Sequence, residues 1–494
     1  MADRGSRALK PKKGGRMRLG LNGASPTDSL DPGQLTDTFA AEVSFGQTRN
    51  CLVELNEKHE AVGELAESWV SSPGADTWHF QLRKGVEFHN GKSLTSEDVV
   101  YTLQQHFGAG SKSMVRILLK PIKSVKADGP TAVVFELEAG NIDFPYILSD
   151  YHLSIVPAGT AGTDYEKGIG TGGYILKDWK PGVRALTIRN PNYWKQGRAH
   201  FDEVETLAMN DVSARTEALI AGKVDIIDQV DLQTLEALEK TPGIKIVRTS
   251  EMRHNAISMR TDRAPFNNNH VRLALKFALD RDAVLKEVQH GQGKLGNDTP
   301  IGPGHRYFAN EIPQRKYDPD KAKWHLRQAG LNQLRLELTT ADVAFAGAVK
   351  LAHLYKEHAL RAGIEMSVTK VPDEIFWPKA WMESSWRTSY WSGHVIADWI
   401  LSAVYAHGSP WNETYWSNDR FNRLLVAARS EQNEDLRRRM YVKMQQIIHD
   451  DGGAVIPVFA DHVAAVRDNV TTPDELIPAW GFDGHKAMER WWFA

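Results

Sequence analysis

The order of strand-like and helix-like segments constrains the fold of this chain more than any other feature of its sequence. Five segments rich in β-branched and apolar residues are predicted as strands, at 185–189, 206–210, 244–248, 334–339 and 365–369. Amphipathic segments predicted as helices lie between and after them, at 212–220, 271–279, 320–330 and 345–362. Such alternation favours mixed or parallel sheets with helices on both faces, which is an α/β architecture.

Length and composition limit the class of protein further. The chain has 494 residues, enough for two or three domains, and its 41% hydrophobic residues are ordinary for a globular protein. A formal charge of −2 gives no indication of nucleic-acid or anionic-membrane binding. A single cysteine, Cys51, excludes an internal disulfide and a cysteine-based zinc site.

The N-terminal segment is polar and basic. Residues 1–15 contain no apolar core of the kind that a signal peptide needs. We expect this segment to be a disordered arm. Two interpretations stay open from composition alone, a cytosolic protein or an exported one whose signal has been replaced by Met1.

Tryptophan is concentrated in one stretch, where residues 376–416 contain seven of the chain's 15 tryptophans. The gaps between them are irregular, and Gly393, Gly408 and Pro410 interrupt any long helix. Tryptophan combines a large apolar face with one N–H donor, which suits a pocket that grips and orients an organic ligand. The alternative is a core or an interface patch.

Catalytic and nucleotide-binding motifs are incomplete in this sequence. Gly168, Gly170 and Gly173 have the spacing of a dinucleotide-binding loop, but a predicted strand at 174–177 follows them where that motif requires a helix. His59-Glu60 lacks the second histidine of a zinc protease, and no Gly-x-Ser-x-Gly elbow occurs. These patterns give no support for an enzyme, and we expect no cofactor.

One long segment carries a specific resemblance. Residues 66–69 read AESW and residues 78–99 read WHFQLRKGVEFHNGKSLTSEDV, a predicted hairpin followed by a helix with Thr95 and Asp98 as a capping box. This order resembles the signature region of the family 5 extracytoplasmic solute-binding proteins, the oligopeptide, dipeptide, nickel and opine receptors of bacterial ABC importers. Further matching segments, GTGGY, RNPNYWK, PFNNNHVRLALKFALDRD and YDPDKAKWHLRQAG, extend the resemblance over about residues 16–490.

The resemblance implies a two-lobe periplasmic-binding-protein fold of the class II type, with an extra subdomain inserted in the first lobe. We place lobe I at 16–250 and 462–494, with the insertion at about 46–165, and lobe II at 251–461. Two hinges are expected, near 249–252 and 460–463.

The resemblance also implies a function. We expect a periplasmic, monomeric substrate-binding protein that captures a small organic solute between two closing lobes and delivers it to the permease subunits of an ABC importer. The solute would be a short peptide or an amino-acid-derived compound such as an opine. The alternatives are a receptor for nickel or another metal chelate and a hydrolase of peptides or conjugates.

The family's ligand-contact zones map onto thirteen residues of this sequence. They are Ser25, Arg49, Asn50, Arg253, His254, Asn255, Arg260, Tyr390, Trp391, His394, Asp398, Trp399 and Trp411.

Two positions depart from the family pattern. Arg260 stands where many relatives have asparagine, and its planar fork of donors suits a ligand carboxylate, although a surface salt bridge is the alternative. Many peptide receptors place an acid three residues after Trp391 to pair with the peptide's ammonium group, but this chain has His394 there. Asp398 is the nearest acid after it, and it could instead cap the following helix. We expect a ligand with at least one carboxylate.

Overall fold

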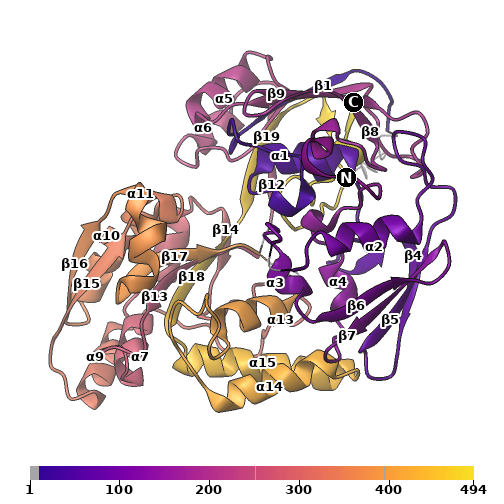
Figure 1. The fold of residues 1–494 in the computed structure, drawn as a ribbon. Coiled ribbons are helices and arrows are strands. Elements are labelled where there is room, and N and C mark those ends of the chain that lie inside the picture. The colour runs from indigo at the N-terminus through magenta and orange to yellow at the C-terminus, as the bar shows by residue number, and fades with distance from the viewer. Residues whose placement is uncertain (1–10, 109, 251, 394–395) are drawn as a thin grey trace, which may run out of the picture. The chain divides into compact units, whose positions relative to one another are not determined.

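The computed structural model describes residues 11–494 except 109, 251 and 394–395, and the chain folds into two compact units (Figure 1). Unit 1 comprises the described residues up to Thr249 together with His462–Ala494, and unit 2 comprises Ser250–Asp461. The chain passes between the units twice, after strand β12 (Ile244–Thr249) and between strands β18 (Ala454–Ala460) and β19 (His462–Arg467).

A seven-stranded sheet organises unit 1, with the order β12-β19-β11-β1-β10-β9-β8. Its central strand β1 (Arg16–Leu21) runs parallel to both of its neighbours, while the outer pairs are antiparallel. The other strands are β11 (Ile226–Ile227), β10 (Glu203–Ala208), β9 (Arg184–Arg189) and β8 (Tyr174–Lys180). Helices α1 (Thr38–Val43) and α5 (Val212–Ile220) pack near β1 and β10, where apolar side chains such as Leu19 and Phe39 are fully buried.

A second sheet of unit 1 is antiparallel and has the order β4-β5-β7-β6. Its strands are β4 (Ala66–Ser71), β5 (Thr77–Leu82), β7 (Ala132–Leu137) and β6 (Ile122–Ala127), and helix α2 (Ser96–Gln104) packs on it. The predicted capping box is present, because the Thr95 side chain accepts a hydrogen bond from the Asp98 backbone N–H and the Asp98 carboxylate accepts one from the Thr95 backbone N–H at 2.9 Å.

Short elements complete unit 1: β2 (Val53–Leu55), β3 (Ala61–Gly63), β20 (Val470–Thr471), β21 (Trp492–Phe493), α3 (Arg116–Leu119), α4 (Phe144–Ile147), α6 (Leu235–Glu239), α16 (Ala487–Arg490), η1 (Pro32–Gln34), η2 (Ser44–Thr48), η3 (Tyr151–Leu153) and η4 (Gly162–Lys167). A buried ion network joins distant parts of this unit. Lys195 Nζ lies 2.7 Å from Glu54, 2.8 Å from Glu64 and 3.1 Å from Glu489.

A six-stranded sheet organises unit 2, with the order β14-β18-β13-β17-β15-β16. Its remaining strands are β14 (Gly293–Leu295), β13 (His254–Met259), β17 (Trp386–Trp391), β15 (Leu334–Thr340) and β16 (Ile364–Lys370). β15 and β16 are parallel, whereas β13 is antiparallel to both β17 and β18. All six residues of β13 are buried, as expected for a strand inside a covered sheet.

Helices cover the sheet of unit 2. The long helices α7 (Asn269–Phe277), α9 (Pro319–Gln328) and α10 (Ala348–Leu360) share one apolar core with it, built around residues such as Leu275, Leu351 and Trp386. Helices α14 (Asp419–Ser430) and α15 (Glu434–Asp451) lie side by side and form a second core (Figure 1). Short elements are α8 (Arg281–Ala283), α11 (Asp373–Ile375), α12 (Trp381–Glu383), α13 (Ala397–Ile400), η5 (Val284–Val288), η6 (Asp342–Ala344), η7 (Phe376–Ala380) and η8 (Leu401–Tyr405). In the part of the chain that the structure describes, no helix has the length and apolar character that a membrane span requires.

The predicted elements listed above agree with the observed ones in type, and most of them differ at their ends. The helix predicted at 212–220 is α5, with the same bounds. The helix predicted at 345–362 begins only at Ala348, because Phe345 is extended and Gly347 has a φ of 86°, outside the helical region.

Asp298 gives unit 2 a defined sensitivity to acid. Its fully buried carboxylate lies 2.5 Å from Arg281 and 2.8 Å from Arg315. Burial favours the protonated form, but the positive charges of Arg281, Lys276 and Arg315 outweigh this effect and lower the pKa of Asp298 from 3.8 to about 2. Ionised Asp298 therefore stabilises the fold above about pH 4, and this contribution is lost as the pH falls towards 2.

We expect the wild-type chain to lose about 2 kcal/mol more unfolding free energy between pH 4.5 and pH 2 than the variant Asp298→Asn loses. Urea unfolding at the two pH values measures this difference. Equal losses in both proteins would contradict the assignment of this acid sensitivity to Asp298.

Candidate functional site

The tryptophan-rich segment folds into one array of neighbouring rings in unit 2. Consecutive ring centroids lie 5.6 Å apart for Trp377 and Trp381, 6.1 Å for Trp381 and Trp391, 6.3 Å for Trp391 and Trp411, and 6.0 Å for Trp411 and Trp399. We call these five residues the indole array. All five side chains are partly exposed.

The other two tryptophans of the segment belong to the core. Trp386 is 1% exposed and Trp416 is 3% exposed, and each packs in an apolar cluster of unit 2. The core interpretation of the tryptophan-rich segment therefore holds for these two residues, and the five residues of the indole array remain the candidates for a ligand-binding surface.

Trp391 of the indole array lies at the end of strand β17, where the strand leaves the buried part of the sheet. Residues 386–389 are buried, whereas Tyr390 and Trp391 at the end of the strand are partly exposed. Trp377 and Trp381 lie four residues apart on the helical turns η7 and α12, which places them on the same side. Beyond the strand, Gly393 lies so close to Met252 that a Cβ atom at 393 would meet the Met252 backbone nitrogen at 2.6 Å, so this position requires glycine.

A buried carboxylate holds two rings of the array. Glu413 is 1% exposed. It accepts hydrogen bonds from Trp391 Nε1 at 2.9 Å, from Trp381 Nε1 at 2.5 Å, and from the hydroxyls of Ser258 and Ser389 at 2.8 Å each. Four donors on one buried acid fix the orientation of both indoles before any ligand binds.

Arg387 supplies the countercharge for this acid. Its side chain is fully buried, its Nη2 lies 3.6 Å from Glu413 Oε2, and the same nitrogen donates a hydrogen bond to the Glu413 carbonyl. Burial lowers the pKa of Arg387, while the Glu413 carboxylate opposes that shift. The result is a buried ion pair directly beneath the array.

Arg253 and Asn255 form a polar corner beside the array. The Arg253 guanidinium lies 4.7 Å from the centroid of the Tyr390 ring, and Asn255 pairs with Tyr390 in the register of β13 and β17. Arg253 Nε and both side-chain amide atoms of Asn255 are buried, and they have no hydrogen-bond partner among the described residues. Tyr390 in turn lies 5.7 Å from Trp377, so this corner is continuous with the array.

Arg260 and Asp398 are engaged within the protein. The Arg260 guanidinium donates to Asp262 at 2.7 and 3.0 Å and to the Met382 carbonyl at 3.0 Å. Asp398 accepts a hydrogen bond from Arg429 at 2.9 Å. Arg260 is therefore engaged by Asp262, whereas Arg253 has no acidic partner among the described residues, and Asp398, which could have paired with a ligand ammonium group or capped a helix, pairs with Arg429.

The remaining predicted contacts are distributed over both units. In unit 1, Ser25 is partly exposed, while Arg49 and Asn50 are buried and bond within the unit, Arg49 to the Leu30 and Tyr165 carbonyls and Asn50 to Glu64. In unit 2, His254 is buried against Phe459, and Trp399 and Trp411 belong to the indole array. His394 lies outside the described residues.

Trp377, Trp381 and Glu413 were not among the residues predicted to bind. Both tryptophans belong to the same tryptophan-rich segment as Trp391, and their spacing of four residues is the sequence feature that could have identified them. Glu413 had no local signal, because its four donors come from positions between 22 and 155 residues away along the chain.

Comparisons with known proteins agree with this fold. The sequence profile described as "Bacterial extracellular solute-binding proteins, family 5 Middle" matches residues 60–413. Heme-binding protein A of Haemophilus influenzae is 27% identical over 458 residues, covering 85% of this chain and 83% of that protein. The glutathione-binding protein GsiB of Escherichia coli K12 is 25% identical over 473 residues, covering 92% and 91%.

A solved structure extends the likeness to the whole chain. The ABC transporter-associated periplasmic binding protein DppA of Helicobacter pylori, in complex with the peptide STSA, has a TM-score of 0.79. It is 23% identical in sequence, and the match covers 98% of both chains. At this identity the similarity shows the fold, the two-lobe α/β fold of periplasmic binding proteins.

Proposed function

The chain belongs to the bacterial extracellular solute-binding proteins of family 5, and we propose that it captures a carboxylate-bearing organic solute for an ABC importer. The observation that carries this proposal is the juxtaposition of the indole array with the polar corner of Arg253 and Asn255. The array offers flat apolar faces, and the corner offers a cation and an amide with unused hydrogen-bonding capacity.

The chemistry of the corner selects the class of ligand. A guanidinium stacked on a ring keeps its planar fork of donors available for a carboxylate. A neutral sugar would leave the Arg253 charge without a partner if the site became desolvated, which is strongly unfavourable. Heme, glutathione and a short peptide all carry carboxylates, and these are the ligands in the names of the three relatives described above.

The mechanism that we propose is capture without a chemical step. Ligand contacts from both lobes stabilise a closed state over an open one, and the closed state is delivered to the permease. In this proposal the two units are the lobes, and the hinges lie near 249–252 and 460–463, as expected from the sequence. We propose a periplasmic location and a monomeric state for the mature protein.

Native mass spectrometry of the purified protein, followed by calorimetric titration, tests this proposal. We expect a retained carboxylate-bearing ligand, or binding of at least one of heme, glutathione and a tetrapeptide. Maltose is the uncharged control and is expected not to bind. Recovery of the ligand in cleaved form would indicate a hydrolase instead, and preference for a nickel–histidine chelate would indicate a metal receptor.

A further inference from the structure

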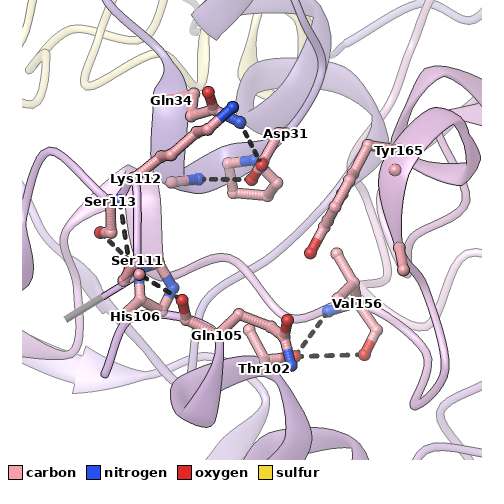
Figure 2. A pocket seen from close by; sticks show the side chains of 15 residues that line it. Asp31, Gln34, Thr102, Gln105, His106, Ser111, Lys112, Ser113, Val156 and Tyr165 are labelled. Atoms are coloured by element: carbon pink, nitrogen blue, oxygen red, sulfur yellow. Dashed lines mark hydrogen bonds between the residues drawn. The ribbon is translucent and has the colours of Figure 1, made fainter. Parts of the chain in front are cut away.

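A cavity of about 220 Å³ lies in unit 1, far from the indole array in sequence (Figure 2). It is bounded by the turn around Asp31, by the C-terminal half of α2, by residues 110–113 and by the helical turn η4, which contains Tyr165. One water molecule needs about 15 Å³ on the same measure, so the cavity has room for a small organic molecule.

Much of the polar wall of this cavity is held by hydrogen bonds within the protein. The Thr102 hydroxyl bonds to the Val156 backbone at 3.1 and 3.2 Å, and His106 Nδ1 lies 2.7 Å from the Ser113 hydroxyl. Figure 2 shows these bonds along the floor and one side. The wall is therefore fixed by its own contacts and is preorganised for a ligand.

Three groups on the wall keep unused bonding capacity. Tyr165 is 8% exposed, and its hydroxyl points into the cavity and has no hydrogen-bond partner in the described chain (Figure 2). Lys112 has no acidic partner among the residues that the structure describes. The Asp31 carboxylate accepts from Gly33 N at 3.0 Å and from Gln34 Nε2 at 2.6 Å, which uses about half of its acceptor sites.

The formal charges of the residues that line the cavity sum to zero. Asp31 contributes one negative charge and Lys112 one positive charge. Burial lowers the pKa of His106 to about 4, so this ring is neutral at pH 7 and adds no charge. A dicarboxylate or a phosphate would bring a second negative charge close to Asp31, whereas a zwitterion would offer each charged group an opposite partner.

We propose that this cavity is a second ligand site, which binds a free α-amino acid or a zwitterion of similar size. The ammonium group of the ligand faces Asp31, its carboxylate faces Lys112, and the Tyr165 hydroxyl bonds to its polar body. The site is separate from the indole array, and it does not depend on which solute the array binds.

Calorimetric titration of the full chain with L-serine tests the proposal. L-Lactate lacks the ammonium group and ethanolamine lacks the carboxylate, and each is expected to bind at least about tenfold more weakly than L-serine. The variants Lys112→Met and Asp31→Asn should weaken L-serine binding at least about tenfold, and Tyr165→Phe about fivefold. Lys120→Met and Tyr101→Phe change the same residue types outside the cavity lining and should leave the affinity within about twofold.

Variants at the indole array and at the cavity distinguish this proposal from the proposed function. Trp391→Ala and Arg253→Ala should leave L-serine binding unchanged, whatever they do to the solute of the array. If these two variants abolish L-serine binding and Lys112→Met does not, L-serine binds at the array and the cavity proposal is overturned. Absence of L-serine binding up to about 10 mM would overturn it as well. Lys112 is exposed, so its variant should fold as the wild type does, which thermal unfolding checks.

Discussion

Replacing Glu413 by glutamine should lower the free energy of unfolding by about 3–5 kcal/mol. The variant leaves Arg387 fully buried without its countercharge. A glutamine also offers one acceptor oxygen in place of two, so the indole N–H groups of Trp381 and Trp391 and two serine hydroxyls compete for it. Urea unfolding of the full chain measures the loss.

The same variant should weaken solute binding about tenfold or more at temperatures where it stays folded, because two rings of the array lose their fixed orientation. Glu383→Gln is the matched control. Its side chain is 74% exposed, and its ion pairs with Arg260 and Arg263 are 3.9 and 3.6 Å long, so we expect a change within about 0.5 kcal/mol. An equal effect of the two substitutions would refute the anchoring role of Glu413.

A double-mutant cycle tests the ion pair itself. Adding Arg387→Met to Glu413→Gln removes the unpaired buried charge. We expect the double variant to be at least about 1 kcal/mol more stable than the sum of the two single effects predicts. Strict additivity would mean that the two side chains do not interact.

Arg253→Ala should weaken binding of a carboxylate-bearing solute by about thirtyfold or more, the cost of removing one partner from a desolvated charge pair. Its guanidinium is stacked on Tyr390 and has no acidic partner in the described part of the chain. Arg253→Lys keeps the charge but loses the planar fork, so its affinity should lie between those of the wild type and the alanine variant.

Arg260→Ala is the matched control for Arg253→Ala. Arg260 already donates to Asp262 and to the Met382 carbonyl, so its loss should lower stability and leave solute affinity within about twofold. Calorimetry with the same solute distinguishes the two arginines. If Arg260→Ala weakens binding and Arg253→Ala does not, the assignment of the carboxylate partner is reversed.

The local sequence determined the elements of this fold and its class. Helix α5 and the strands β9, β12, β15 and β16 follow from apolar periodicity, which a segment carries whatever it packs against. The capping box of Thr95 and Asp98 follows from two residues three positions apart. The segment from 66 to 99 was specific enough to identify the family, and the tryptophan cluster marked the stretch that contains the array.

Only the tertiary structure decided which of those residues are buried in the core and which stay partly exposed. Whether a tryptophan enters the core, as Trp386 does, or the array, as Trp391 does, depends on where β17 leaves the sheet. Arg260 is paired because Asp262 lies beside it. Arg253 instead lies over the ring of Tyr390, which is 137 residues further along the chain. Glu413 reaches Ser258 across 155 residues. Strand register and long-range packing set such contacts, and a local sequence pattern contains no information about either of them.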